Sequence, residues 1–198
     1  MNRSAVIFDL DGTLTKPYLD FHVIRAEIGI TSGPILEGIA EMPSGERTRA
    51  KSILMRHEWE AARNGELQEG AVEVVAHCRR EGHPVALLTR NTRLVVDHIL
   101  STHGFHFDAI RTREDDAIKP SPEPVLSICR ELDADPEQSW VVGDYLFDLQ
   151  SGRSAGTRTV LMIGDDEPAP FASLADHVIR RLAELPAIVV AARSTERA

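Results

Sequence analysis

Short apolar runs alternate with segments of helical periodicity along most of this chain, and that alternation restricts the possible folds more than any other feature. The runs that predict strands are residues 5–8, 85–88, 107–110, 140–142 and 159–163, with a weaker sixth at 177–179. Between the later runs lie segments of about a helix's length, with apolar residues at helical spacing. This order predicts an α/β fold in which a parallel sheet is covered by helices on both faces.

One interval breaks the alternation. Residues 9–84 separate the first two runs, whereas a crossover between parallel strands needs only about a dozen residues. Within that interval, residues 20–64 have helical spacing. We therefore expect a small inserted helical cap at residues 16–69, carried by a sheet domain made of residues 1–15 and 70–198.

Composition excludes several classes of protein. The chain has 198 residues, 42% of them hydrophobic, enough for one domain with a small insertion. Its net charge of −9, without a run of Lys and Arg, argues against a nucleic-acid partner. Two distant cysteines, Cys78 and Cys129, suggest neither a disulfide framework nor a thiolate metal site. No apolar run has the length of a membrane span or a signal peptide, so we expect a cytoplasmic protein without a membrane partner.

A pair of carboxylates ends the first predicted strand, in AVIFDLDGTLT. Residues two apart in a strand point to the same side, so Asp9 and Asp11 face one site while Leu10 faces away. Two adjacent carboxylates at the edge of an apolar sheet are costly unless a cation or a shared proton offsets them. A divalent metal ion is the simplest such cation. The alternative is an Asp-Gly turn, capped by one of the two aspartates.

A second pair follows the run at residues 140–142, in WVVGDYLFDLQSG. Asp144 and Asp148 are four residues apart, one turn of a helix. Asp144 could instead cap the next helix, with Asp148 on a solvated face. Both pairs, however, lie at carboxyl ends of strands, where open α/β sheets bind ligands. Four converging carboxylates suit Mg²⁺, which takes carboxylates, waters and phosphate oxygens.

Two further strand ends offer phosphate contacts. Thr89, in VALLTRNT, has a hydroxyl beside the backbone N–H groups of a predicted helix N-terminus. Asn91 or Thr92 can serve as that helix's cap. Lys119, in DDAIKPSPEP, precedes a proline and a second predicted helix start. An isolated lysine there is otherwise a surface residue.

With these motifs in hand, the chain resembles the haloacid dehalogenase superfamily, in the phosphatase-like subgroup with a small helical cap after the first motif. The resemblance covers nearly the whole chain and rests on DLDGT, LLTRN, KPSPE and GDYLFD, in the family's order. It implies a Rossmann-like, doubly wound sheet in which the strand before Asp9 is central. The strands before Thr89 and Asp144 would lie on either side.

The resemblance also implies roles for the acidic residues. Asp9 would be the nucleophile that forms an aspartyl-phosphate. Asp11 would be the general acid and base, with its backbone carbonyl on Mg²⁺. Asp9 and Asp144 would ligate the metal, and Asp148 would lie close by, as a ligand through water or as a partner of the residues that bind the metal directly.

The basic and hydroxyl residues have implied roles as well. Thr89 and Lys119 would hold the transferring phosphoryl group, and Lys119 would also neutralise Asp9. The chain departs from many relatives in TRN, where Arg90 takes the place of an asparagine. Arg90 could bind phosphate in a bidentate manner or point to solvent.

These features predict a Mg²⁺-dependent phosphatase that hydrolyses a small phosphomonoester, so its partner would be a small phosphorylated metabolite. A phosphotransferase or phosphomutase with the same intermediate is the alternative. A phospho-accepting signalling module is a third, but it needs neither Asp11 as an acid nor a cap. Carbon–halogen hydrolysis is disfavoured, because relatives with that activity lack the aspartate at Asp11. The sequence does not indicate the oligomeric state.

Overall fold

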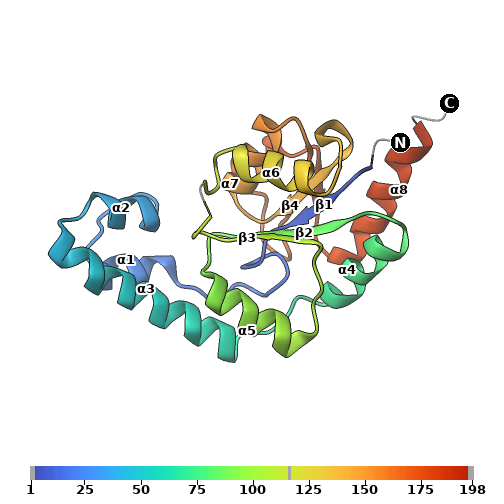
Figure 1. The fold of residues 1–198 in the computed structure, drawn as a ribbon. Helices are drawn as coiled ribbons and strands as arrows, with labels where there is room; N and C mark the ends of the chain where they lie inside the picture. The colour runs from blue at the N-terminus through green and yellow to red at the C-terminus, as the bar shows by residue number, and fades with distance from the viewer. Residues whose placement is uncertain (1–2, 116, 196–198) are drawn as a thin grey trace. The chain divides into compact units, whose positions relative to one another are not determined.

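A six-stranded parallel sheet forms the centre of the larger unit of this protein (Figure 1). The computed structural model describes residues 3–115 and 117–195. The strand order is β3-β2-β1-β4-β5-β6, the order of a doubly wound nucleotide-binding fold. The strands are β1 (Val6–Phe8), β2 (Val85–Leu88), β3 (Ala109–Arg111), β4 (Trp140–Gly143), β5 (Arg158–Met162) and β6 (His177–Ile179). The predicted fold class is confirmed.

The register of the central strands brings their ends to one level. Phe8, the last residue of β1, pairs with Leu87 of β2 on one side and Val142 of β4 on the other. Loops from three adjacent strands therefore leave the sheet together. β1 is central, as predicted, and all three of its residues are buried, as expected for a strand covered on both faces.

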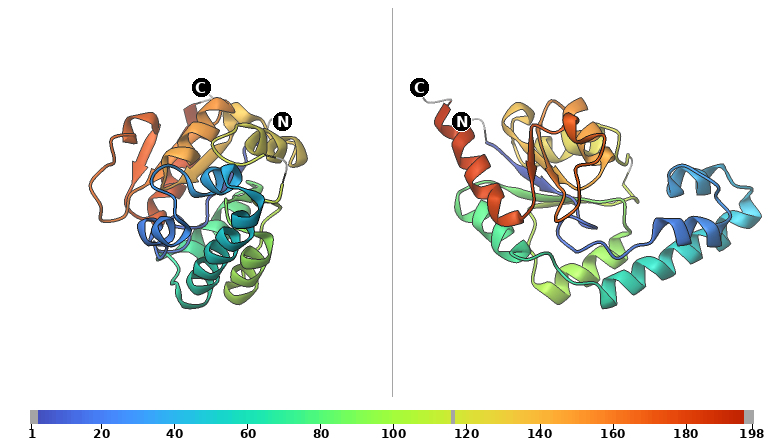
Figure 2. Two further views of the ribbon diagram at one scale, coloured as in Figure 1. Left: turned by 90° about the vertical axis from the view of Figure 1, so that its left-hand side faces the viewer. Right: turned by 180° about the vertical axis from the view of Figure 1, so that it is seen from behind.

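Helices cover both faces of the sheet (Figures 1 and 2). On one face, α6 and α7 pack over an apolar cluster that includes Ile7, Val125, Ile128 and Val141. The helices of this unit are α4 (Ala71–Arg80), α5 (Arg93–His103), α6 (Glu123–Glu131), α7 (Leu146–Ser154) and α8 (Leu185–Thr195), with short 3-10 turns at η1 (Pro136–Gln138), η2 (Ala172–Leu174) and η3 (Leu182–Glu184). In the described parts of the chain, no helix has the length and apolar character needed to cross a membrane.

A second compact unit comprises Pro17–Gly65. It contains α1 (Phe21–Ile28), α2 (Ile35–Glu41) and α3 (Ser44–Asn64). Asp20 begins α1, since its carboxylate accepts hydrogen bonds from the backbone N–H groups of His22 and Val23. The unit has its own apolar core, formed by Ile24, Ile28, Ile35, Ile39, Ala50 and Leu54. This core explains how a short insertion can hold a fold of its own.

The connection between the two units differs slightly from its predicted position. The first unit comprises Met1–Lys16 and Glu66–Ala198, so Lys16 and residues 66–69 belong with the sheet. Backbone hydrogen bonds explain this, because the Lys16 N–H donates to the Glu66 carbonyl at 2.8 Å and the Gln68 N–H donates to the Leu14 carbonyl at 2.9 Å. The Lys16 ammonium also pairs with the Glu66 carboxylate at 2.6 Å. That the helical unit acts as a cap remains a prediction.

Candidate active site

The loop after β1 carries the first two predicted site residues. Asp9 is 8% exposed, and its N–H donates to the Val142 carbonyl of β4 at 2.9 Å, which continues the strand ladder by one residue. Leu10 is fully buried, so the carboxylates on either side of it project away from the core, as strand alternation requires. Asp11 is held separately, because Asn91 Nδ2 donates to its Oδ2 at 3.2 Å.

Lys119 links two of the acidic residues. Its Nζ donates to Asp9 Oδ1 at 2.5 Å and to Asp148 Oδ1 at 2.6 Å, and the residue is 4% exposed. Burial alone would lower the pKa of Lys119, but the carboxylates of Asp148 and Asp9 outweigh that effect and raise it. The two carboxylates therefore favour the charged form of Lys119 inside the site, and Lys119 is not the surface residue that the sequence left open.

Asp144 follows β4 directly, and Asp148 lies in the first turn of α7. Asp148 is 1% exposed, and its Oδ2 accepts from the N–H of Tyr145 at 3.0 Å, which caps the helix. Asp144 is held by Thr13, whose hydroxyl donates to its Oδ1 at 3.2 Å. Asp148 therefore faces the site, not solvent.

Two glycines allow these carboxylates to approach the backbone. A Cβ added to Gly12 would lie 2.2 Å from Asp144 Oδ2, and a Cβ on Gly143 would lie 2.2 Å from Asp148 Cγ. Gly12 also has a φ of 91°, in the left-handed region that other residues adopt at a cost. The acidic cluster thus occupies space that any other residue type at these two positions would fill.

Three carboxylates form a set that fits a metal ion. Oxygen atoms of Asp9, Asp144 and Asp148 lie within 4.8 Å of one another. The side chain of Asp11 is not part of this set, so its predicted metal contact would have to come from its backbone carbonyl. An all-oxygen set of carboxylates is what Mg²⁺ prefers.

The raised pKa values of these carboxyl groups indicate that the negative charge of the cluster is not fully compensated. Burial raises the pKa of Asp9 well above its usual range, with Lys119 opposing the shift and the other carboxylates adding to it. Burial and then Asp148 raise the pKa of Asp144 to about 7. Burial also raises the pKa of Asp11, which the hydrogen bond from Asn91 partly offsets. One lysine does not neutralise the cluster, so a divalent cation fits its charge as well as its donor atoms.

Thr89 follows β2 and lies beside the same loops. It is 2% exposed, and its Oγ1 accepts from the N–H of Asn91 at 3.1 Å. Thr92, not Asn91, caps α5, since its Oγ1 accepts from the Val95 N–H at 3.4 Å. Asn91 instead uses its side chain to bond Asp11. Sequence reasoning offered Asn91 only as a cap, because nothing in its local sequence indicates a partner 80 residues away.

Arg90 lies between Thr89 and Asn91, and its side chain is partly buried. Its Nη1 donates to the backbone carbonyl of Lys119 at 2.9 Å. The loops after β1, β2 and β4 and the segment containing Lys119 thus bring together all the predicted site residues of the sheet unit.

Comparison with known proteins identifies the family. A model of the family described as "Hydrolase: haloacid dehalogenase-like hydrolase" matches residues 4–156, which is most of the chain. The chain belongs to the haloacid dehalogenase-like hydrolases. The predicted superfamily and the predicted hydrolase class are therefore confirmed.

Individual relatives of this hydrolase agree with that assignment. An uncharacterized hydrolase of Saccharomyces cerevisiae is 34% identical over 167 residues, which cover 80% of this chain and 76% of the relative. A phosphoglycolate phosphatase of Cupriavidus necator is 28% identical over 96% of this chain and 94% of its own length. The crystal structure of a hydrolase from Pseudomonas syringae has a TM-score of 0.80 at 18% identity, over 94% of this chain and 98% of that one. The structural likeness supports the fold alone.

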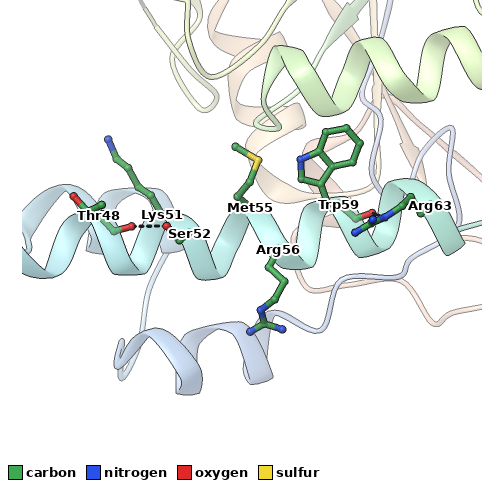
Figure 3. A pocket seen from close by; sticks show the side chains of 7 residues that line it. All are labelled: Thr48, Lys51, Ser52, Met55, Arg56, Trp59 and Arg63. Atoms are coloured by element: carbon green, nitrogen blue, oxygen red, sulfur yellow. Dashed lines mark hydrogen bonds between the residues drawn. The ribbon is translucent and has the colours of Figure 1, made fainter.

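A surface pocket of the hydrolase lies elsewhere, along α3 of the helical unit. Its lining residues are Thr48, Lys51, Ser52, Met55, Arg56, Trp59 and Arg63. Figure 3 shows Met55 and Trp59 pointing away from α3 on one side and Arg56 pointing away on another. None of the residues of the acidic cluster lines this pocket.

Proposed function

We propose that this hydrolase is a Mg²⁺-dependent phosphatase that hydrolyses a small phosphomonoester through an aspartyl-phosphate on Asp9. The observation that carries the proposal is the buried arrangement of Asp9, Lys119 and Asp148, with the carboxylate of Asp144 in the same cluster. A lysine on a buried carboxylate lets that carboxylate approach a phosphate dianion, which would otherwise repel it.

In the first step, a carboxylate oxygen of Asp9 attacks phosphorus while the bond from phosphorus to the ester oxygen breaks. The proton of Asp11 moves to the leaving oxygen, which departs as an alcohol. The raised pKa of Asp11 favours the protonated acid that this step needs. Asn91 orients the Asp11 carboxyl through its hydrogen bond.

In the second step, Asp11 takes a proton from water, and the resulting oxygen attacks phosphorus. The acyl phosphate bond breaks, which releases inorganic phosphate and restores the Asp9 carboxylate. Thr89 and Lys119 hold the phosphoryl oxygens through both steps. Positioning and charge stabilisation of this kind are most of what phosphoryl transfer requires.

Mg²⁺ would be held by the carboxylates of Asp9, Asp144 and Asp148 and by the Asp11 backbone carbonyl. When bound, it supplies the positive charge that stabilises the transferring phosphoryl group. The raised pKa values of Asp9 and Asp144, caused first by burial, support this assignment because they indicate uncompensated negative charge.

The substrate is proposed to be a small phosphorylated metabolite in the cytoplasm, and the helical unit over Pro17–Gly65 to be a cap that excludes water during turnover. Relatives whose names include phosphoglycolate phosphatase and N-acetylmuramic acid 6-phosphate phosphatase support phosphomonoesters as the class.

The test is phosphate release by the full chain from a panel of phosphomonoesters, with Mg²⁺ and with EDTA. We expect Asp9→Asn to lower kcat/KM by at least about 1,000-fold. Asp97→Asn is the matched control, since Asp97 is exposed on α5, and it should retain wild-type activity. Release that persists in Asp9→Asn or in EDTA would contradict the proposed mechanism.

A second measurement, the trapping of the phosphoenzyme, separates hydrolysis from transfer. Acid quenching during turnover of a radiolabelled ester should trap an alkali-labile phosphoenzyme in the wild type and none in Asp9→Asn. Asp11→Asn should lower turnover and lengthen the lifetime of any phosphoenzyme that forms. A phosphoenzyme that is stable in water and is discharged only by added sugar hydroxyls would favour the phosphotransferase or phosphomutase.

A further inference from the structure

The Arg90 guanidinium makes two kinds of contact at once, one with its edge and one with its face. Along its edge, Nη1 donates to the Lys119 carbonyl at 2.9 Å. Across its face, Cζ lies 4.8 Å from the centroid of the Phe147 ring, within the range of a cation–π contact. A planar guanidinium can stack on the ring with its face while it donates from its edge, a geometry that the compact ammonium of lysine does not reproduce.

These contacts join three segments that are distant in the sequence. Arg90 follows Thr89 at the end of β2, Lys119 precedes α6, and Phe147 stands next to Asp148 in the first turn of α7. The backbone of Arg90 is tied as well, because Arg113 Nη1 lies 3.5 Å from its carbonyl oxygen. Arg90 therefore contacts the main chain of Lys119, while the Lys119 ammonium donates to Asp9 and Asp148.

We propose that Arg90 is a positioning residue that fixes Lys119 through its backbone carbonyl and α7 through Phe147, and that it is not a direct phosphate ligand. This inference rests on the proposed function, since it concerns the same phosphoryl-transfer site. It gives Arg90, which stands where many relatives have an asparagine, the role of positioning the buried Lys119. The Nη1 atom, which a bidentate phosphate contact through both terminal nitrogens would need, donates here to the Lys119 carbonyl.

The first experiment compares Arg90→Gln and Arg90→Lys with the wild type on one good phosphomonoester. Displacing a charged group by about 1 Å can cost on the order of 100-fold in rate, so we expect kcat to fall between about 10-fold and 100-fold while KM changes by less than about 3-fold. Arg90→Lys keeps the charge but loses the flat face, so it should restore only part of kcat. An increase in KM with kcat unchanged would indicate a ground-state phosphate contact and would overturn the inference.

Arg93→Gln is the matched control. Arg93 is also partly buried, and its Nη2 also donates to a backbone carbonyl, that of Ile110 at 3.3 Å. Within the described residues, none of its hydrogen bonds reaches a predicted site residue. We expect its kcat to stay within about 2-fold of the wild type. A loss in Arg93→Gln equal to that in Arg90→Gln would reduce the effect to general loosening and would count against a specific role.

A double-mutant cycle with Lys119→Ala gives the decisive reading. Because Arg90 is proposed to act partly through Lys119, Arg90→Gln should cost a smaller factor in kcat once the Lys119 side chain is gone, and the factor that remains reflects its contact with Phe147. If Arg90 were a direct phosphate ligand, Arg90→Gln would lower kcat by the same factor in both backgrounds, and that result would overturn the inference.

Guanidinium ion at millimolar concentration should rescue Arg90→Ala but not the double variant. Phe147→Leu, which removes only the stacking face, provides a milder variant should Arg90→Gln fail to fold.

Failure of the proposed function would give a different result. In that case wild type and Arg93→Gln would both release no phosphate from any ester, before any comparison with Arg90 variants is made. Active wild type and Arg93→Gln with fully active Arg90→Gln would instead leave the proposed function standing and remove the role of Arg90.

Discussion

The two units of this hydrolase differ in the solvent exposure of their ion pairs. In the sheet unit, Lys119 binds Asp9 and Asp148 where all three side chains are almost completely buried. In the helical unit, Glu27 of α1 binds Arg56 and His57 of α3, and the Glu27 and Arg56 side chains remain 37% and 53% exposed. Burying charges is costly unless geometry and partners offset the cost, whereas exposed pairs contribute little. The cost of the buried network is consistent with the catalytic role proposed for it, whereas the exposed pairs are expected to contribute little to the stability of the fold.

The largest expected effect comes from removing the buried cation. Lys119→Met should lower the free energy of unfolding by about 3–5 kcal/mol in EDTA, because it leaves carboxylates buried without their partner. Mg²⁺ should recover part of this loss, since a cation bound only to the folded state stabilises it. Thermal and urea unfolding, with and without Mg²⁺, measure both effects.

Lys51→Met is the control for that variant, because Lys51 is exposed on α3. It should leave the unfolding curve unchanged and insensitive to Mg²⁺. Equal losses in the two variants would break the distinction drawn between the units.

The next effect is a dependence of stability on pH. Asp144 has a pKa of about 7 in the folded protein, raised by burial and by Asp148 from an ordinary value of 3.8. Between these two values the folded state binds more protons than the unfolded chain, so stability falls as pH rises from about 4 to 7. In EDTA this group should contribute at most about 4 kcal/mol across that interval, at about 1.4 kcal/mol per pKa unit.

Unfolding temperatures of the wild type and Asp144→Asn, measured from pH 4 to 8 in EDTA, test this expectation. The variant cannot titrate at that position, so its slope should be shallower, though not zero, because the pKa values of Asp9 and Asp11 are also raised, chiefly by burial. Parallel slopes would show that Asp144 does not carry the linkage.

A smaller effect separates backbone strain from crowding at the site. Gly12 and Gly29 have nearly the same φ, 91° and 93°, but an added Cβ meets Asp144 at Gly12 and nothing within 4 Å at Gly29. Gly12→Ala should therefore cost about 1–2 kcal/mol more in unfolding free energy than Gly29→Ala. It should also lower activity and Mg²⁺ affinity, which Gly29→Ala should leave intact. Equal stability losses would mean that strain alone accounts for Gly12.

The smallest effect is expected at the exposed pair. Arg56→Gln removes the contact with Glu27, whose pKa is lowered by the hydrogen bond from His57 and then by Arg56. Because the pair is solvated, the unfolding temperature should change by less than about 2 °C, and 0.5 M salt should erase the difference. A shift comparable with that of Lys119→Met would show that the exposed network also stabilises the fold.

Much of the fold could be predicted because its determinants are local. Strand β2 matches the predicted run at residues 85–88, and the helical insert has its start at Asp20 and a core of regularly spaced isoleucines. The predicted insert, residues 16–69, included residues 66–69, which belong with the sheet unit. The sequence could not show this, because the hydrogen bonds of this segment to Leu14 and Lys16 join parts of the chain that are distant in the sequence.

The site was predictable only where a motif encodes it. Asp9 and Asp144 stand at strand ends that the apolar runs reveal. The hydrogen bonds from Asn91 to Asp11 and from Thr13 to Asp144 were not predicted, because each partner lies on a different loop and no local pattern connects them. Arg90 left two interpretations open for the same reason, since its contact with Lys119 depends on tertiary structure.

The paired segments at residues 14–16 and 66–68 have a consequence for how this sequence can change. They hold the two ends of the helical unit side by side, through the Thr15 and Leu67 bridge and the Lys16 and Glu66 ion pair. A segment that leaves and re-enters a sheet at neighbouring points imposes little on the order of the strands. Recombination could therefore exchange the whole of Pro17–Gly65 for a longer or shorter module as a single event, and the strand order of the sheet would stay the same.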